Sequence, residues 1–331
     1  MIIEAGIMGT GIYLPEKIVT NDDMAAIVDT SDEWISTRTG MKRRHVSSGE
    51  ETWYMGWKAA EQALMNAQVT AEDVDIVIVT STTPDYYTPS MASVIQGELG
   101  AVNAFAYDMN AACSGFVFAY DQAAHYLLNP EINHILIVSC ESLTKLVDYT
   151  DRSTCVLFGD GAAAVVLGRN GGKLVASELG GDGKAADAIV ANALRSEHPF
   201  YEEDDNAFER RFDYEGEKIY MDGHEVYRFA VRTLVQAVKN VLEKSGVDKS
   251  ELALLIPHQA NNRIIQAAAR RLELGTEQVF SFIEETGNIS SATIPYCLHE
   301  LFMQDELKKG DKIVICGFGA GLTYGASLLT I

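Results

Sequence analysis

The chain has 331 residues, 47% of them hydrophobic and 22% charged, which is enough to bury the large core of one duplicated domain or of two domains. Its net charge of -21 argues against binding to nucleic acid or to an anionic membrane surface, and no apolar run of about 18 residues predicts a membrane span. The five cysteines are irregularly spaced, which favours reduced thiols in the cytoplasm over a disulfide framework.

Residues 1–15 lack the basic and apolar regions of a signal peptide and are expected to form a first strand. The first half of the chain then alternates helical and strand patterns. Helices are predicted at 52–67, 89–98 and 114–128, and strands at 75–82, 104–110, 134–140 and 155–168. Several of these strands are continuous runs of Val, Ile and Leu, which are typical of strands covered on both faces of a sheet.

The second half repeats this alternation. Helices are predicted at 223–245, 260–272 and 292–307, and strands at 252–260, 279–284 and 311–319. The acidic segment 201–217 is interpreted as a solvated surface excursion without chemistry. Strands that alternate with helices favour a layered α/β architecture.

The two halves also resemble each other at one helix start. The sequence "MNAACSGF" opens the helix at 114, and "GNISSATIP" opens the helix at 292. An internal duplication places Cys113 and Asn288 at equivalent helix starts. The glycine clusters do not follow the dinucleotide-binding fingerprint, so tight turns explain them better than phosphate binding.

Cys113 follows a predicted strand and precedes a helix, with small residues on both sides. The thiolate is the nucleophilic form of cysteine, and the positive end of a helix dipole favours it. We therefore consider Cys113 a candidate nucleophile, although from this segment alone a buried structural cysteine is the simpler explanation. The other cysteines lie within apolar patterns and are expected to be structural: Cys140, Cys155, Cys297 and Cys316.

Two polar residues of the second half are candidate partners for this thiol. His258, in "LLIPHQANNRII", lies between a predicted strand and a helix, where α/β sheets place ligands. Asn288, in "ETGNISSATIP", lies at the other helix start. Its amide is expected either to donate a hydrogen bond into a site or to cap the helix.

The motifs "AACSGF", "PHQANNRI" and "GNISSATIP", in this order, resemble the Cys-His-Asn set of the β-ketoacyl-acyl-carrier-protein synthase III family. Further matches are "DTSDEWISTRTGMKRRH", "TDRSTCVLFGDGAAAVVLG" and "GFGAGLTYG", so the resemblance runs through the whole chain. It implies the thiolase-like fold, a five-layered α/β/α/β/α core made from two duplicated βαβαβαββ halves, and a homodimer. The halves are expected at 1–170, with the cysteine, and 171–331, with the histidine and asparagine.

The family's reaction is a decarboxylative Claisen condensation of an acyl-CoA primer, acetyl or another short or branched group, with malonyl-acyl-carrier-protein. It begins type II fatty acid biosynthesis and proceeds through an acyl-cysteine. By resemblance, Cys113 accepts the acyl group, and His258 and Asn288 hold the enolate formed on decarboxylation. The backbone N–H groups of Cys113 and Ala320 form an oxyanion hole. Phe158, Phe318 and Thr88 are expected to line the site. No cofactor and no metal is expected, since acyl-CoA is a substrate and no metal-ligand spacing is present.

The resemblance also implies binding surfaces. Trp34, Arg38 and Arg152 match the family's CoA contacts, with adenine between Trp34 and Arg152. Without the resemblance, Trp34 is an ordinary aromatic residue. The basic residues that match the family's carrier-protein docking patch are Arg228, Arg263, Arg270 and Arg271. A solvated helix face is the alternative interpretation of these arginines.

The chain departs from the family pattern near the site. The changed positions are Ile289, Ser291, Thr293, Ala320 and Tyr324, and a small residue, Thr88, stands where many members carry a bulky one that reaches the partner subunit's acyl pocket. The small residue suggests a longer or branched acyl group. Two other enzymes fit the motifs: a related ketosynthase of secondary metabolism, and a cysteine acyl-thioester hydrolase. A non-catalytic binding protein is a third alternative.

Overall fold

The computed structural model describes residues 1–193, 212, 214 and 216–331, so most of the acidic segment 201–217 lies outside the described residues. The first half of the chain alternates strands and helices as the sequence predicts. Its main elements are β1 (Ile3–Tyr13), α3 (Thr52–Ala67), β4 (Ile76–Thr80), α4 (Met91–Leu99), β5 (Phe105–Met109), α5 (Gly115–Tyr126), β6 (Ile135–Ser142) and the beginning of β7 (Asp160–Gly181).

The second half repeats this order of elements. It comprises the end of β7, then α7 (Gly223–Ser245), β10 (Leu252–Pro257), α8 (Asn262–Leu272), a single bridge at Val279, α10 (Thr293–Met303), β11 (Lys312–Gly319) and β12 (Thr323–Thr330). Val279 pairs in parallel with Leu255 of β10, as β5 pairs with β4. The predicted duplication into two βαβαβαββ halves is therefore confirmed.

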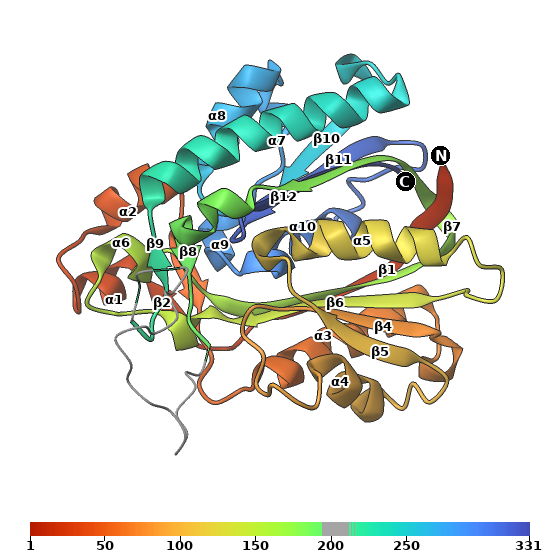
Figure 1. Cartoon of the computed structure of the whole chain (residues 1–331), viewed down its shortest axis with the longest axis horizontal. Helices are drawn as coiled ribbons and strands as arrows, with labels where there is room; N and C mark the ends of the chain where they lie inside the picture. Colours follow the sequence, from red (N-terminus) through yellow and green to blue (C-terminus); the bar gives the residue numbers. More distant parts are fainter. Residues whose placement is uncertain (194–211, 213, 215) are drawn as a thin grey trace, which may run out of the picture.

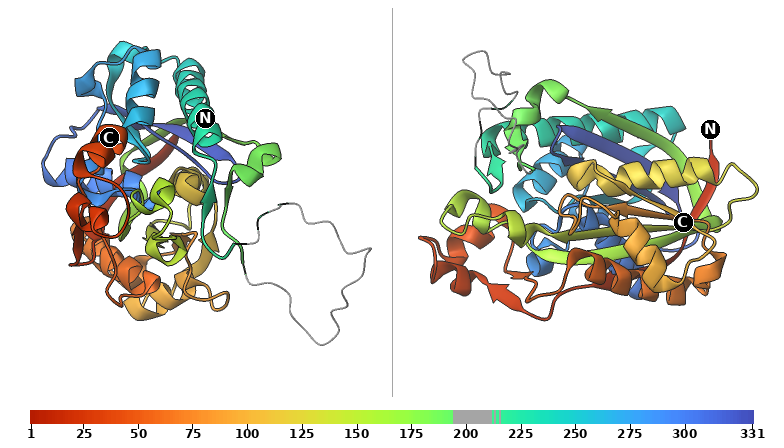
Figure 2. Two further views of the ribbon diagram at one scale, coloured as in Figure 1. Left: turned by 90° about the vertical axis from the view of Figure 1, so that its left-hand side faces the viewer. Right: turned by 60° about the horizontal axis from the view of Figure 1, so that its bottom comes forward.

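The elements stack in five layers. The strands of the main sheet are hydrogen bonded in the order β10-β11-β12-β7-β6-β4-β5, and β1 pairs with β7. In Figure 1, α5 and α10 lie between the strands of the two halves, while α7 and α8 cover the outside of one half and α3 and α4 the outside of the other. Figure 2 shows the same two outer helix layers at the top and bottom of the end-on view. The predicted α/β/α/β/α arrangement is thus the observed one.

Strand β7 joins the two halves. Its beginning pairs with β6, where Asp160 lies opposite Ser142, and its end pairs with β12, where Lys173 lies opposite Thr330. We propose that the halves divide within this strand, at residues 1–170 and 171–331. The long strand couples the two sheets because both share its backbone.

The central helices are buried because both of their sides face a sheet. Phe116 and Tyr120 of α5 and Leu298 of α10 are 5% exposed or less and pack with strand residues of both halves, such as Ile78 and Ile315. At roughly 25 cal/mol per Å² of apolar surface, each such side chain contributes about 1.5–3 kcal/mol. The apolar helix pattern therefore serves two sheets at once.

Smaller elements gather at the end of the molecule where the strands of each half finish (Figure 1). They are β2 (Ile18–Thr20), α1 (Asn21–Ala25), α2 (Asp32–Thr39), β3 (Arg43–His45), α6 (Arg152–Cys155), β8 (Ile189–Val190), β9 (Tyr220–Met221) and α9 (Ile283–Thr286). Within the described ranges, none of the helices combines the length and apolar character that a membrane crossing needs.

Two predicted strands differ from the structure, and one observed strand was not predicted. The segment 155–168 begins as helix α6, and its strand starts only at Asp160. The segment 279–284 forms one isolated bridge, between Val279 and Leu255 of β10, with a hydrogen bond from the N–H of Phe280 to the carbonyl of Leu255 at 3.0 Å, and then helix α9. Strand β12 was not predicted, since "TYGASLLT" is rich in small residues rather than in continuous Val and Ile.

The close approach of β1 to α3 yields a test of the packing. A Cβ added to Gly11 would lie 2.2 Å from the carbonyl oxygen of Ala59. Gly11→Ala is expected to lower the free energy of unfolding by about 1–3 kcal/mol because helix and strand must separate. Gly97→Ala is the matched control: Gly97 is exposed on α4 with no atom within 4 Å of an added Cβ. The free energy of unfolding of Gly97→Ala should rise by about 0.5–1 kcal/mol, because alanine has the higher helix propensity. Equal denaturation midpoints for the two variants would contradict this packing.

Candidate active site

One cavity of about 1090 Å³ contains the three reactive residues that the sequence indicates. Cys113 from the first half and His258 and Asn288 from the second half all line it. It opens at the end of the molecule where β5, β10 and β11 finish, which is where α/β sheets place ligands. A thiol, an imidazole and a carboxamide therefore line one cavity.

Cys113 is fixed in a short 3-10 turn (Ala112–Ser114) between β5 and α5. The turn is fixed from the second half: the Ser114 and Thr323 hydroxyl oxygens lie 2.6 Å apart, and Thr323 donates to the carbonyl of Ala111 at 3.0 Å. Ala112 has a φ of +48°, which is unfavourable for a non-glycine residue. Strain of this kind persists only where the surroundings determine the backbone, and it sets the direction of the neighbouring thiol.

The expectation that the helix start favours a thiolate at Cys113 is wrong for the free enzyme. Burial raises the pKa of the Cys113 thiol to about 12, and the negative charge of Glu141 adds to this shift. The hydroxyl of Ser290 and the backbone of Cys113 itself lower the pKa again, but by less than burial raises it. The thiol is therefore protonated at neutral pH until something removes its proton.

His258 follows β10 directly and is 1% exposed. Its backbone N–H donates to the carbonyl of Cys316 at 2.7 Å, and its ring lies 5.5 Å from that of Phe318 in an edge-to-face arrangement. Burial lowers the pKa of the imidazole to about 3, so the ring stays neutral at physiological pH. Its Nδ1 lies 2.7 Å from the hydroxyl oxygen of Thr293, which leaves Nε2 for the cavity.

Asn288 is held by backbone bonds on both sides. Its N–H donates to Leu157 at 2.9 Å, and its carbonyl accepts from Gly159 at 3.0 Å. The side-chain Oδ1 accepts from the N–H of Ser290 at 2.8 Å, so the amide NH₂ group is the end left to donate into the cavity.

The repeat equates Asn288 with Asn110 rather than with Cys113. Asn110 likewise accepts from the N–H two residues later, that of Ala112, at 3.2 Å. Ser290 has a φ of +51°, close to the value at Ala112. The position equivalent to Cys113 is therefore Ser291. The predicted helix starts do correspond, but the two reactive residues stand three positions apart in the repeat.

The other expected lining residues divide into two groups. Phe158, Phe318 and Ala320 line the cavity, and Ala320 is not among the residues with positive φ, so the change from the family's glycine strains no backbone there. Thr88 does not line the cavity of this single chain, because it is exposed on the connection between β4 and α4. Its predicted place in an acyl pocket requires a partner subunit.

The predicted CoA contacts form a cluster at the cavity mouth. Trp34 and Arg38 line the cavity, and the guanidinium carbons of Arg38 and Arg152 lie 4.7 and 5.0 Å from the Trp34 ring centroid. An adenine between two planar groups needs about 7 Å, twice the usual stacking distance. The predicted sandwich therefore requires Arg152 to move away from Trp34.

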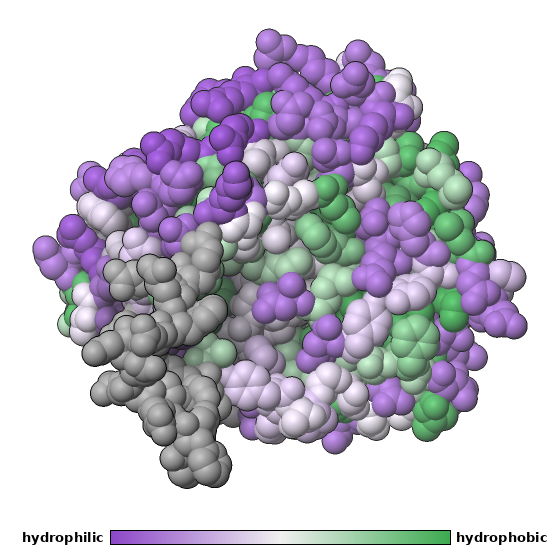
Figure 3. Space-filling model, in the orientation of Figure 1, coloured by the Kyte–Doolittle hydropathy of each residue, from purple (hydrophilic) through white to green (hydrophobic). Residues whose placement is uncertain are grey.

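The four predicted docking arginines do not form one tight cluster. Arg263 lines the cavity at the start of α8. Arg228 is exposed on α7, the helix that packs against α8, and forms an ion pair with Glu225. Arg270 and Arg271 are exposed near the end of α8, about 10 Å further along the helix axis. The hydrophilic surface over α7 is visible in Figure 3.

The remaining departures from the family pattern lie behind the cavity wall. Ile289 packs with Ala163 and Tyr296, and Tyr324 packs edge-on against Phe229, so neither lines the cavity. Glu141, Ser290 and Thr293 have no role predicted from the sequence, although their side chains contact the reactive residues or lie beside them. The one available signal was the run of hydroxyl residues in "GNISSAT".

Comparison with known proteins agrees with this geometry. Residues 107–183 match the model of 3-oxoacyl-[acyl-carrier-protein] synthase III, and residues 242–331 match that of its C-terminal part. The β-ketoacyl-[acyl-carrier-protein] synthase III of Clostridium acetobutylicum is 45% identical over 98% of this chain and 97% of its own length.

Solved structures extend the similarity to the whole fold. The 3-oxoacyl-[acyl-carrier-protein] synthase III of Aquifex aeolicus superposes with a TM-score of 0.90 at 40% identity, covering 99% of this chain and 100% of that one. The priming β-ketosynthase of the R1128 polyketide pathway superposes with a TM-score of 0.88 at 34% identity, covering 99% and 96%. The fold is thus the thiolase-like fold of two-half condensing enzymes. The chain belongs to the 3-oxoacyl-[acyl-carrier-protein] synthase III family.

The contact between β11 and the Cys113 turn can be tested with two glycines of one strand. A Cβ on Gly319 would lie 2.6 Å from the backbone nitrogen of Cys113, whereas one on Gly317 would make ordinary contacts at 3.4 Å or more. Gly319→Ala is expected to lower the free energy of unfolding by about 1–3 kcal/mol, because the turn must shift. Gly317→Ala, the matched control, should stay near wild type in the same urea titration. Loss of stability in both variants, or in neither, would show that the turn is not held as described.

Proposed function

We propose that this protein condenses an acyl-CoA primer with malonyl-acyl-carrier-protein by decarboxylative Claisen condensation and so starts type II fatty acid biosynthesis. The observation that carries the proposal is the single cavity lined by Cys113, His258 and Asn288. Membership of the synthase III family supports the same activity. Acyl-CoA and the malonyl carrier are its substrates, and the chemistry needs no cofactor.

Acyl transfer is the first step. The sulfur of Cys113 attacks the thioester carbonyl of acyl-CoA, a carbon–sulfur bond to Cys113 forms, and the bond to CoA breaks. The backbone N–H groups of Cys113 and Ala320, which both line the cavity, stabilise the oxyanion of this step. Covalent catalysis divides the overall reaction into two easier steps.

Decarboxylation is assigned to the two neutral donors. Nε2 of His258 and the amide of Asn288 donate to the thioester oxygen of the malonyl group while carbon dioxide leaves. A ring that donates from Nε2 must accept at Nδ1, so the hydroxyl of Thr293, 2.7 Å from Nδ1, must turn its single proton to the ring instead of to the carbonyl of Ser290, which it reaches at 3.0 Å. Neutral donors suit this step, since an imidazolium would be costly in so buried a site. The resulting enolate carbon attacks the acyl-cysteine, and the thiolate of Cys113 leaves.

The acyl-CoA enters along the Trp34 side of the cavity. Its adenine stacks on Trp34 once Arg152 has moved aside, and Arg38 stays over the same ring. Thr88 is assigned to the acyl pocket of the partner subunit, where its small side chain leaves room for a longer or branched primer.

Homodimerisation is proposed through the free edge of β5. This strand pairs with β4 on one side and ends the order of the described strands. Phe105 is 50% exposed and stacks on Tyr107, which gives the edge an apolar surface. A second copy of β5 would continue the sheet and cover this edge.

Five free cysteines favour a cytoplasmic location.

The carrier protein is proposed to dock around Arg263 and Arg228, beside the cavity. Carrier proteins of this kind are acidic, and this chain has a net charge of -21, so attraction must be local. Arg270 and Arg271 extend the patch along α8 but lie further from the cavity. The start of α8 therefore governs the encounter.

A second candidate function comes from the polyketide relative. The 34% identity to the priming β-ketosynthase of the R1128 pathway favours a related starter condensation of secondary metabolism as the alternative. Such an enzyme would share the cavity and differ in the thioesters that it accepts.

Labelled acyl-CoA tests the proposed reaction directly. Incubation is expected to place one acyl group on Cys113, found by mapping the labelled peptide, and malonyl-carrier should then release it as a 3-oxoacyl-carrier. His258→Ala and Asn288→Ala are expected to keep the label but lose decarboxylation by about 10²–10³-fold, since each removes one donor to the enolate. Cys113→Ala should not be labelled.

Three outcomes would contradict this function. Label released by water without malonyl thioester would indicate a hydrolase. Equal use of malonyl-CoA and malonyl-carrier would favour the secondary-metabolism enzyme. Label on another residue would remove Cys113 from the reaction.

Charge reversal tests the docking patch. Arg263→Glu is expected to raise KM for malonyl-carrier about tenfold at low salt, and the difference should shrink as salt is added. Lys309→Glu makes the same charge change on an exposed loop before β11, at the end of that strand away from the cavity, and should leave KM unchanged. A salt-independent effect, or equal effects of both variants, would remove Arg263 from the patch.

A further inference from the structure

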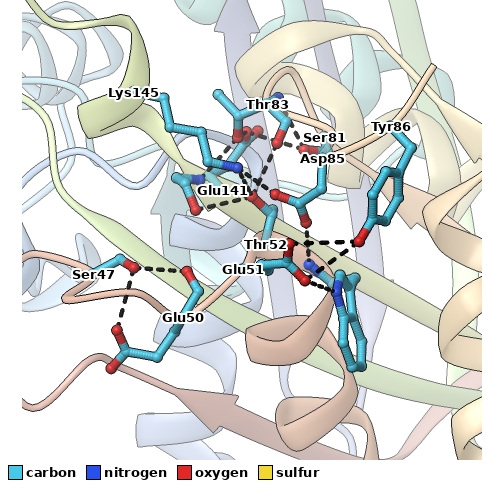
Figure 4. A network of polar contacts seen from close by, with 12 residues as sticks. Ser47, Glu50, Glu51, Thr52, Ser81, Thr83, Asp85, Tyr86, Glu141 and Lys145 are labelled. Atoms are coloured by element: carbon cyan, nitrogen blue, oxygen red, sulfur yellow. Dashed lines mark hydrogen bonds and ion pairs between the residues drawn. The ribbon is translucent and has the colours of Figure 1, made fainter.

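A buried carboxylate lies behind the Cys113 thiol. Glu141, at the end of β6, is 0% exposed. Oxygen Oε2 accepts hydrogen bonds from the hydroxyls of Thr83 at 2.7 Å, Thr82 at 3.0 Å and Ser81 at 3.3 Å. Figure 4 shows Ser81 and Thr83 beside Glu141. None of the described basic side chains forms an ion pair with it.

The lysine of this network, Lys145, is ion-paired with another carboxylate. Lys145 pairs with Asp85 and donates to the hydroxyl of Thr52 at 2.9 Å (Figure 4). A buried carboxylate without a counter-ion is costly, and burial raises the pKa of Glu141 above its ordinary value. Oxygen Oε1 has fewer partners than Oε2: the N–H of Thr82 at 3.2 Å and the hydroxyl of Ser291 at 3.5 Å. The group is thus a buried base with one oxygen still able to accept a proton.

The side chain of Ser290 connects this carboxylate with the thiol. Ser290 is 1% exposed and lines the cavity beside Cys113. Its hydroxyl lies close enough to the thiol and to Glu141 to lower the pKa of both, yet in the free enzyme it makes no hydrogen bond of good geometry. An unsatisfied buried hydroxyl is costly, so its place between an acid and a base calls for a reason.

We propose that Glu141 accepts the proton of the Cys113 thiol through the hydroxyl of Ser290 when the enzyme is acylated. This inference rests on the proposed function, because it supplies the base that the acyl-transfer step needs. In this scheme Ser290 exchanges a proton with the reacting thiol and is therefore a catalytic residue. Glu141 acts through it.

The steps balance as follows. The thiol proton passes to the oxygen of Ser290 while the hydroxyl proton of Ser290 passes to Oε1 of Glu141. The sulfur forms its bond to the acyl carbon, and CoA leaves as a thiolate that takes a proton from water. In the second step the enolate carbon displaces Cys113, and Glu141 returns its proton through Ser290 to the departing thiolate. No oxidant or further reactant is required.

His258 is a poorer acceptor on physical grounds. Transfer of the proton to its neutral ring would create an imidazolium and a thiolate together in a buried site, whereas transfer to Glu141 only moves one negative charge from oxygen to sulfur. Burial lowers the pKa of His258 to about 3, which makes its ring a weaker base, and raises the pKa of Glu141, which makes its carboxylate a stronger one. The same neutral ring remains available as a donor for decarboxylation.

The alkylation rate of Cys113 at pH 7 tests the relay without any substrate. The free full-length enzyme is treated with iodoacetamide, and Cys113 modification is followed by mass spectrometry. Glu141→Gln and Ser290→Ala are each expected to slow alkylation about 10²-fold, the usual size of a general-base contribution. If Glu141 acted only by its charge, Glu141→Gln would accelerate alkylation, because that charge raises the pKa of the thiol. The two accounts therefore predict opposite signs.

Ser290→Ala is included because this variant is expected to fold normally. The serine hydroxyl has no hydrogen bond to lose, and Ala112 shows that alanine adopts the same backbone at the equivalent position of the repeat. Ser327→Ala is the matched control: it removes a buried hydroxyl of β12 that faces Ser177 rather than Glu141 and does not line the cavity, and it should react at the wild-type rate. Alkylation of Ser290→Ala as fast as wild type, or slowed no more than Ser327→Ala, would overturn the relay.

Acylation by acyl-CoA, measured in a single turnover, separates the two proposals. Acylation of wild type at Cys113 with a roughly 10²-fold loss in Ser290→Ala supports both. If wild type takes no acyl group but the variants still slow alkylation, the proposed function fails and the relay survives. Normal acylation of both variants overturns the relay and leaves the function intact.

Discussion

Two hydrogen bonds that cross between the halves fix the helix starts at the centre of the molecule. The hydroxyl of Ser114, beside Cys113, meets Thr323 of the second half at 2.6 Å. Reciprocally, Thr80 of the first half donates to Ser291 of the second at 3.0 Å. Each half thus positions the reactive helix start of the other. Buried hydroxyl pairs are costly to break, so the duplicated fold holds residues far apart in sequence around one cavity.

Burial then shifts the pKa values of His258 and Cys113 in that cavity and of Glu141 behind it. It keeps His258 neutral and Cys113 protonated, and it favours a proton on Glu141. A dry site strengthens hydrogen bonds to the negative charge that develops on a thioester oxygen, but it also makes any isolated charge expensive. An enzyme built this way needs neutral donors and a route by which one proton leaves and returns. The hydroxyls of Ser290 and Thr293 serve these two needs in the proposed mechanism.

Much of the fold is predictable from the sequence. Helices α3 and α7 occur at the predicted residues because their apolar spacing is regular, and α7 in addition ends at a clear stop signal, Gly246. Strand β12 escapes prediction because its small residues pack only in the context of β11 and β7. In the site, the three reactive residues were indicated by motifs, yet the pKa of Cys113 was expected to shift the wrong way. Burial and the charge of Glu141 arise from contacts distant in sequence, and a local pattern does not contain them.

The central claim is that the thiol of one half reacts inside a cavity built with donors of the other. A crystal structure of the enzyme after reaction with a short acyl-CoA measures this most directly. The account predicts an acyl group on the sulfur of Cys113, lying in the same cavity as His258 and Asn288, with its carbonyl oxygen within hydrogen-bond distance of the backbone N–H groups of Cys113 and Ala320. An acyl group that points into a different space, with those side chains out of reach, would contradict it.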